Sequence, residues 1–193
     1  MKKKQQALLL VMAVSALAGS WQVAHGAYIY AKAQLAQYLL AGAWQESRQI
    51  QQPVKPWSWA DTWPVAKLEA SAYDIDLIIL AGDTGRTLAF GPGYNLASVR
   101  PGDTGNSIIS AHRDTHFKFL QKLKLDDEIV IENQLGNRKR FAVSDIRIVD
   151  SRNTTIPVNS NIAMLTLVTC YPFDAIEAGG PLRYVVEARE LLI

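Results

Sequence analysis

The stretch "MLTLVTCYPF" (residues 164–173) contains the one cysteine of the chain, Cys170. The apolar run from Met164 to Val168 is typical of a strand, and Pro172 should end it because proline has no backbone N–H to donate. A side chain at the end of a strand can open onto a surface groove. Cysteine is also among the residues most often buried as small hydrophobes. Cys170 is therefore either a reactive thiol or a structural residue, and its surroundings decide between the two.

The segment around this strand, from residue 65 onward, consists of short β-type runs separated by turn-forming residues. The other runs are "YDIDLIIL" (73–80), "SIISAH" (107–112), "EIVIEN" (128–133), "KRFAVSDIRIVD" (139–150) and "RYVVEARELL" (183–192). The Gly- and Pro-rich segments 82–95 and 100–106 predict turns or loops, and residues 115–125 predict one or two helical turns. Seven or eight short strands without strand–helix alternation predict an all-β fold, a closed antiparallel barrel or a sandwich.

The N-terminus reads as a membrane segment. From Gln5 to Ala31, 27 residues lack Lys, Arg, Asp and Glu, and a spanning helix needs about 20 apolar residues. The lysines at positions 2–4 keep this end in the cytoplasm, so the body is translocated. Residues 16–18 (Ala-Leu-Ala) also fit a cleavage site. Because apolar residues continue to Tyr30, we favour an uncleaved single-pass signal anchor over residues 1–30, with the body on the extracytoplasmic, periplasmic side of the inner membrane.

Residues 31–64 predict an extension between the anchor and the body. Residues 31–48 have apolar side chains at helical spacing, and Pro53, Pro56 and Pro64 exclude a regular helix in "QQPVKPWSWADTWP" (51–64). The three tryptophans in this linker either pack over one edge of the folded domain or act as interfacial anchors. The body, residues 65–193, is then one domain.

Composition limits the classes of partner. The chain has 193 residues, 49% of them hydrophobic, and a net charge of +2 that lies partly in the first lysines. This predicts no nucleic-acid binding. A single cysteine in an exported domain indicates an intermolecular disulfide or a reactive thiol. No cofactor is indicated, and a structural calcium ion is left open because the acidic residues show no coordination spacing.

Two further residues can act with the thiol. His112 directly follows the strand "SIISA", and an imidazolium beside a thiol stabilises the thiolate. Arg183 begins the last strand, 13 residues after Cys170. If these two strands are antiparallel neighbours, the arginine and the cysteine meet at one rim, where a cation can stabilise an oxyanion. "HRDTH" (112–116) is not a zinc motif, because Arg113 stands where zincins need Glu.

These residues resemble a known family. "TLVTC" (166–170) is similar to the T-L-x-T-C signature of sortases, which are membrane-anchored cysteine transpeptidases. "IISAHR" (108–113) resembles the segment that carries their histidine, with Ala111 where the family usually has Gly, and Arg183 corresponds to the arginine of their last strand. The resemblance covers roughly residues 65–193. "WSWADTWPVAKL" (57–68) and "CYPFDA" (170–175) look like the Gram-negative, marine-type subgroup.

The resemblance implies a closed eight-stranded sortase-like β-barrel and a transpeptidase. Cys170 would cleave an LPxTG-like C-terminal sorting motif of an exported protein through a thioester, with His112 as acid and base and Arg183 at the oxyanion. The product would pass to an amine acceptor in the cell envelope. Thr169, the Tyr171 N–H and Ala111 are expected near the oxyanion and substrate, and the loop residues Ile156, Pro157 and Val158 are expected to meet an apolar Leu-Pro pair.

Three other protein classes are alternatives to a sortase. An L,D-transpeptidase has its histidine and cysteine close together, whereas 58 positions separate His112 from Cys170. A papain-like peptidase has its cysteine before its histidine. The remaining alternative is a membrane-tethered β-barrel binding module with a buried structural cysteine.

Overall fold

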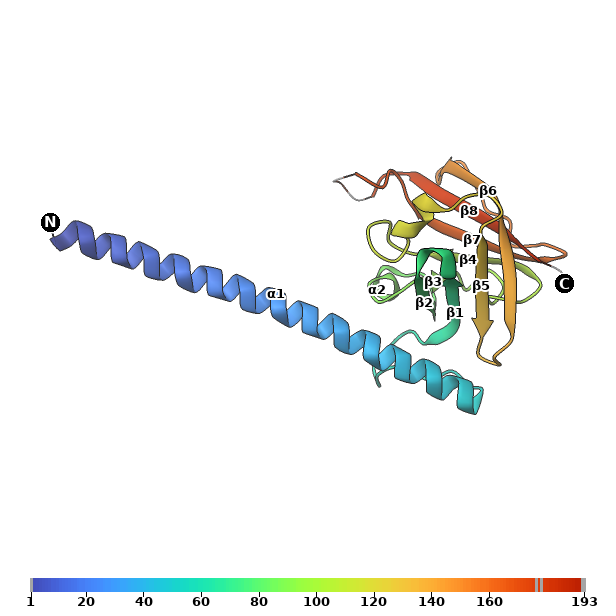
Figure 1. Cartoon of the computed structure of the whole chain (residues 1–193), viewed down its shortest axis with the longest axis horizontal. Coiled ribbons are helices and arrows are strands. Elements are labelled where there is room, and N and C mark those ends of the chain that lie inside the picture. Colours follow the sequence, from blue (N-terminus) through green and yellow to red (C-terminus); the bar gives the residue numbers. More distant parts are fainter. Residues whose placement is uncertain (1, 176, 178, 192–193) are drawn as a thin grey trace. The chain divides into compact units, whose positions relative to one another are not determined.

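The computed structural model describes residues 2–175, 177 and 179–191, and its strands form a closed eight-stranded barrel (Figure 1). The order of strands around the barrel is β1-β2-β3-β4-β7-β8-β6-β5. The strands are β1 (Pro64–Ala70), β2 (Ile75–Ala81), β3 (Gly93–Tyr94), β4 (Gly105–Ser110), β5 (Glu128–Asn133), β6 (Arg138–Asp150), β7 (Ala163–Cys170) and β8 (Leu182–Glu190). The helices are α1 (Lys2–Ile50), α2 (Gly85–Leu88) and the 3₁₀ turns η1 (Ser71–Tyr73) and η2 (Lys118–Lys122). The sequence prediction of a closed eight-stranded barrel is confirmed.

The strands form where one face of the chain is apolar. In β1, every second residue from Pro64 to Ala70 is buried, which is the period of a strand with one face in the core. Phe117, just before η2, is fully buried and fills the interior next to Phe119. The described core comprises chiefly Leu68, Ile79, Ile109, Leu120, Ile129, Ile131, Phe141, Leu165, Leu167 and Val186.

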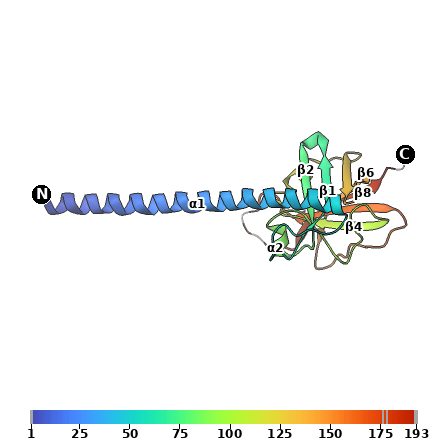
Figure 2. The same ribbon diagram turned by 90° about the horizontal axis from the view of Figure 1, so that it is seen from below.

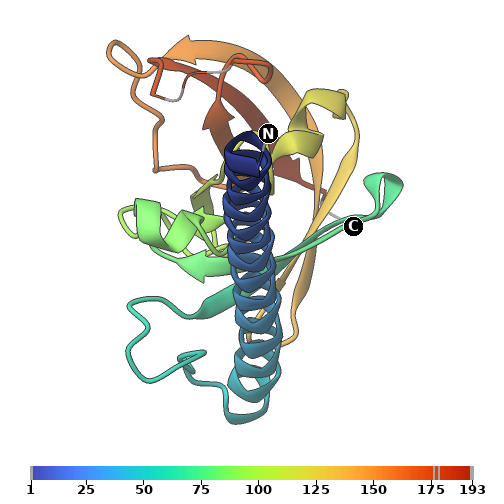
Figure 3. The same cartoon turned by 90° about the vertical axis from the view of Figure 1, so that its left-hand side faces the viewer.

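The antiparallel expectation was wrong for two strand pairs. β4 pairs with β7 in parallel, and β2 pairs with β3 in parallel, whereas the other neighbours are antiparallel. The parallel β4–β7 pair is possible because η2, β5 and β6 lie between them in the sequence and provide the long crossover that parallel strands require. The barrel wall is seen in Figure 3, and the β1–β2 hairpin projects from it in Figures 2 and 3.

The Gly- and Pro-rich segment 82–95, expected to be loop, also contains two short elements. Thr84 caps α2, its hydroxyl accepting from the Thr87 N–H. β3 then inserts between β2 and β4. A Cβ at Gly93 would lie 2.1 Å from the Gly82 carbonyl oxygen, so only glycine allows this close approach.

α1 is one continuous helix, and the compact units of the chain divide after Tyr38. It contains a stretch that is long and apolar enough to cross a membrane, and large side chains such as Leu17 and Trp21 are exposed along it. The helix is therefore a candidate membrane anchor. The sequence division at residues 30 and 64 stays a prediction, with the helix itself ending at Ile50.

The last turns of α1 belong to the same unit as the barrel. Leu40 and Trp44 are buried there, and the Arg48 guanidinium lies 2.9 Å from the carboxylate of Glu132 on β5. Arg138 on β6 contacts the same carboxylate at 3.1 Å. Two guanidinium groups thus compensate one largely buried charge, which joins the helix end to the barrel wall.

The tryptophans of the linker have different environments. The ring of Trp57 packs edge-on against Phe90, with the centroids 5.1 Å apart, and Trp63 packs against the core. Trp59 is 84% exposed. Trp57 and Trp63 therefore pack over the domain. For Trp59 the role of interfacial anchor stays a prediction.

We predict that Leu40→Ala destabilises the barrel unit. The side chain is fully buried, so its truncation should lower the free energy of unfolding by about 2–4 kcal/mol. The measurement is urea unfolding of the full chain in mild detergent, followed by tryptophan fluorescence. Leu35→Ala on the same helix is the matched control, because Leu35 is 56% exposed. Equal effects of the two substitutions would show that the helix end does not pack in this unit.

Candidate active site

Cys170 is the last residue of β7 and faces outward. Leu165, Leu167 and Thr169 are buried, whereas Val168 and Cys170 are half-buried, so the cysteine lies on the outer side of the alternating strand. It is a free thiol outside the core cluster. A sulfur in this place can meet a ligand that lies across the outer face of the barrel.

Arg183 lies directly opposite Cys170. The β7–β8 register pairs the two residues, and paired residues of antiparallel strands point to the same face. The Arg183 Nη1 donates hydrogen bonds to the carbonyl oxygens of Gly180 (2.5 Å) and Leu182 (2.9 Å). The two residues are therefore neighbours on the outer face, and the guanidinium is bonded to the carbonyl oxygens of Gly180 and Leu182.

The charge of Arg183 is partly balanced by Asp150 at the end of β6. Hydrogen bonds from Arg152 mainly, with the positive charge of Arg183 adding to them, lower the pKa of Asp150 to about 2. Asp150 is thus a carboxylate at any ordinary pH. This end of the barrel holds an anion next to the cation that faces Cys170.

His112 reaches the same end from β4. The parallel β4–β7 register ends with Ser110 opposite Val168, and the pairing continues through the Ala111 N–H, which donates to the Val168 carbonyl oxygen at 3.2 Å. Continuing this register by two residues places His112 alongside Cys170. Because Ala111 is buried in the core, the alternation turns His112 outward, and its side chain is exposed.

The backbone around His112 is fixed by the core. Its carbonyl oxygen accepts a hydrogen bond from the N–H of Phe117 at 3.0 Å, and the Phe117 side chain is fully buried. His116 lies in the turn between them and is half-buried. Burial lowers the pKa of His116, and the nearby charge of His112 lowers it further. Both causes disfavour the protonated form of His116.

The outer faces of β4 and β7 extend from these residues toward the loop of residues 151–162. Asn106 connects the two: its Nδ2 donates to the Pro157 carbonyl oxygen (2.8 Å), and its N–H donates to that of Val158 (3.0 Å). Its Oδ1 accepts from Thr166 at 2.8 Å. The predicted substrate residues 156–158 thus lie at the far end of this face, where Ile156 and Val158 are half-buried and Pro157 is exposed.

The three further groups expected near the oxyanion are already engaged. The Thr169 hydroxyl is buried and donates to the Ala111 carbonyl oxygen at 2.7 Å, and the Tyr171 N–H donates to the Leu182 carbonyl oxygen at 3.0 Å. The Ala111 N–H is used in the β4–β7 ladder. Thr169 therefore holds the histidine segment against β7.

Sequence reasoning missed the residues that hold the surrounding loops. Asn106 was read only as part of a turn, and Arg113 only as a departure from a zinc motif. The Arg113 Nη2 donates to the carbonyl oxygens of Ala175 (2.8 Å) and Glu177 (2.9 Å). Both arginine bonds go to backbone acceptors, which leave no mark in the side-chain pattern.

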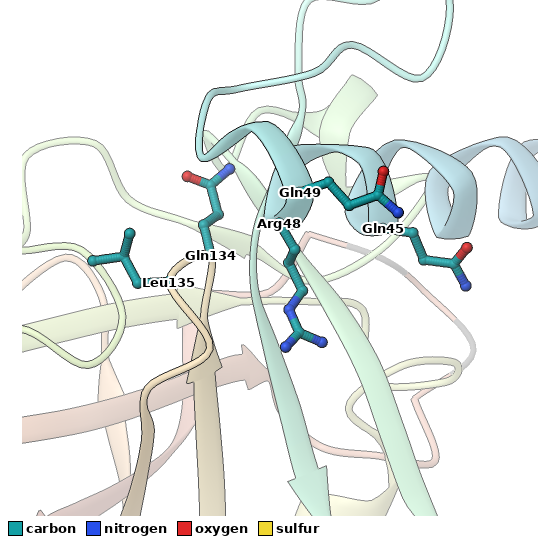
Figure 4. Close-up of a pocket in the computed structure, with 5 residues that line it drawn as sticks. All are labelled: Gln45, Arg48, Gln49, Gln134 and Leu135. Atoms are coloured by element: carbon teal, nitrogen blue, oxygen red, sulfur yellow. The ribbon is translucent and has the colours of Figure 1, made fainter.

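A hollow lies at the end of the barrel opposite to Cys170. It has a volume of about 340 Å³ and is lined by Gln45, Arg48 and Gln49 of α1 and by Gln134 and Leu135 of the β5–β6 turn (Figure 4). None of these side chains is a nucleophile. Within the described part of the chain, no three His, Cys, Asp or Glu side chains are grouped to hold a metal ion. The Cys170 end of the barrel is therefore the stronger candidate for the active site.

Comparison with known proteins identifies the fold and the family. The sortase domain family matches residues 68–191. The chain is 28% identical over 125 residues to sortase D of Bacillus subtilis (strain 168), covering 64% of this chain and 62% of that relative. The chain thus spans less than two thirds of that relative's length.

Solved structures share the barrel. Sortase A of Corynebacterium diphtheriae aligns with a TM-score of 0.61 at 24% identity, covering 82% of this chain and 85% of that chain. The sortase D5 transpeptidase of Clostridium perfringens aligns with a TM-score of 0.66 at 19% identity, covering 82% of this chain and 99% of that chain. The marine-type subgroup stays a prediction.

We predict that His116 makes the stability depend on pH. The pKa of His116 is lowered on folding, so the unfolded chain takes up a proton that the folded chain resists, and stability is lost as the pH falls through about 6.5. His116→Gln should reduce this loss. Urea unfolding near neutral pH and at mildly acidic pH measures it, and His25→Gln in the apolar part of α1 is the control. An unchanged pH dependence in His116→Gln would contradict the assignment.

Proposed function

Since the chain belongs to the sortase family, we propose that it is a transpeptidase with Cys170 as its nucleophile, His112 as its acid and base and Arg183 as its oxyanion ligand. The observation that supports this is the convergence of the three residues at the same end of β4, β7 and β8 on the outer face. The pairing of Cys170 with Arg183 at the rim of the barrel follows from the β7–β8 register alone. A metal or cofactor is not needed for the chemistry.

The first half of the reaction forms a thioester. The Cys170 thiolate attacks the carbonyl carbon of a peptide bond in the sorting motif, and the carbonyl oxygen becomes an oxyanion in the tetrahedral intermediate. His112, as imidazolium, donates its proton to the leaving amine as the C–N bond breaks. The N-terminal part of the substrate stays on the sulfur, and the C-terminal part leaves as an amine.

The second half transfers the acyl group. An acceptor amine attacks the thioester carbon, and neutral His112 removes a proton from it. The C–S bond breaks, the Cys170 thiolate is restored, and His112 is again the imidazolium. The two halves thus use one proton on one imidazole, which returns the site to its starting state.

Arg183 supplies positive charge where the oxyanion develops. In the free protein its Nη1 donates to Gly180 and Leu182. A guanidinium has five N–H donors, so part of the fork can turn to a substrate oxygen while other donors keep the loop. The buried position of the Thr169 hydroxyl leaves this task to the arginine.

The outer face between the two loops is the proposed substrate channel. Ile108 and Val168 are half-buried on the outer sides of β4 and β7, and Ile156 and Val158 stand at the far end. An extended LPxTG-like segment placed along this face would have its apolar Leu-Pro end near the 151–162 loop and its scissile bond near Cys170. The residues of the motif would then lie along the channel in their sequence order.

The proposed setting is the inner membrane. The apolar part of α1 is the anchor, with the lysines on the cytoplasmic side and the barrel on the periplasmic side. The substrate would be an exported protein with a C-terminal LPxTG-like sorting signal, and the acceptor an amine of the cell envelope. Mass spectrometry of the adduct trapped on Cys170 in cells would identify the substrate and its cut site.

We predict that Cys170→Ala, His112→Ala and Arg183→Ala each reduce cleavage of an LPxTG-like peptide by at least about a thousandfold, because each removes a group that acts on the transition state. The measurement is peptide turnover by mass spectrometry, with circular dichroism as the check on folding. Arg189→Ala on the same face of β8 is the matched control, since Arg189 is exposed far from Cys170. Retained turnover in any of the three would remove that residue from the mechanism.

We also predict that a methanethiosulfonate reagent labels Cys170 rapidly in the folded protein. The thiol is half-buried on the outer face, and a nucleophilic cysteine must be accessible as thiolate. Mass spectrometry of the labelled protein at short times measures the rate. Labelling that begins only after denaturation would favour a binding module with a structural cysteine.

A further inference from the structure

The loop of residues 171–182 is tied down from two directions. The second limb, residues 179–182, is held by Arg183, which donates hydrogen bonds to Gly180 and Leu182. Ser151 also holds it, because its hydroxyl and its N–H donate to the Pro181 carbonyl oxygen at 2.8 and 2.9 Å. The first limb, which begins at Tyr171 and includes Ala175 and Glu177, follows Cys170 directly. The contacts of the second limb therefore do not fix the position of the first limb relative to the thiol.

Arg113 holds the first limb. Its Nη2 donates to the Ala175 and Glu177 carbonyl oxygens, and its backbone follows His112. The histidine segment is in turn fixed to β7 by the Thr169–Ala111 hydrogen bond and to the core by Phe117. Arg113 therefore ties the chain that leaves Cys170 to the rigidly held His112 segment.

Aromatic rings anchor the start of this limb on the core side. Tyr171 and Phe173 pack with Tyr184, with ring centroids 6.3 and 5.1 Å from it. Tyr184 is also packed against the core. The rings fix the start of the limb, and Arg113 fixes the part beyond it.

We propose that Arg113 is a positioning residue that holds the first limb of the 171–182 loop as a wall beside Cys170 and so sets the width of the site. The proposal rests on the proposed function for its catalytic meaning, since a wall that narrows the approach to the thiol selects what reaches it. The hydrogen bonds themselves do not depend on that function. Loss of the guanidinium frees the limb without removing a group that touches the reacting atoms.

The first test is hydrogen–deuterium exchange of the full chain in detergent. Arg113→Gln removes two hydrogen bonds from a charged donor and should raise the exchange rate of peptides from the 171–182 loop by at least about tenfold. Arg113→Lys, which keeps a donor, should restore part of the protection. Arg86→Gln is the charge-matched control, because Arg86 is an exposed residue of α2. Unchanged exchange in the loop, or faster exchange spread over β4, β7 and β8, would overturn the proposal.

The second test reads the width of the site at the thiol. Cys170 is labelled with a small reagent, methyl methanethiosulfonate, and with a bulky biotinylated methanethiosulfonate. Both react with the thiolate, so the ratio of the two rates cancels changes in thiolate fraction. Arg113→Gln should raise the bulky-to-small ratio severalfold, and Arg113→Lys should return it toward the wild-type value.

The outcomes separate this proposal from the proposed function. An unchanged labelling ratio in Arg113→Gln overturns the wall. Absence of peptide turnover in the wild-type chain would count against the transpeptidase and leave the exchange and labelling results as they are. A changed ratio that Lys does not restore would also contradict the role of the donor.

Discussion

The parallel hydrogen bonding between β4 and β7 is the constraint on which the site depends. It brings the strand that precedes His112 beside the strand that ends at Cys170, although 58 positions separate the two residues. The antiparallel β7–β8 pair then adds Arg183 on the other side of the cysteine. An imidazole, a sulfur and a guanidinium therefore come from neighbouring positions of one wall, with Cys170 and Arg183 on strands and His112 two residues beyond the end of β4. Strands place such groups more precisely than loops do, because the register fixes each Cα along the wall.

Much of this arrangement could be predicted, for reasons that are local. Cys170 and Arg183 are joined by one loop of residues 171–182, so an antiparallel pair was the simplest connection and the contact followed from it. Several barrel strands were recognisable from their residue patterns, β2 from its alternation at Ile75 to Leu77 and β7 from its apolar run, whereas β1 was not named as a strand. Pro172 marked the end of β7 correctly. The short β3 was missed because two residues, Gly93 and Tyr94, are too few for any periodicity.

The non-local parts were harder to read. Parallel pairing between β4 and β7 depends on a crossover of more than fifty residues, and the sequence pattern of a strand does not state which neighbour it takes. The expected oxyanion donors Thr169 and Tyr171 have suitable groups, but both are used in other hydrogen bonds, and the partners are backbone carbonyls. Arg113 and Asn106 were underrated for the same reason. A side chain that binds backbone has no partner residue to reveal it.

The shared carboxylate of Glu132 has a consequence for how variation is tolerated. Arg48 and Arg138 approach it from the helix end and from β6. Removing either arginine leaves the other beside Glu132. Arg138 also pairs with Glu69 at 2.5 Å, so replacing Glu132 leaves Arg138 compensated but removes the ion pair that joins Arg48 to β5. Glu132 is thus the residue that connects the helix end to the ion-pair network of the barrel wall.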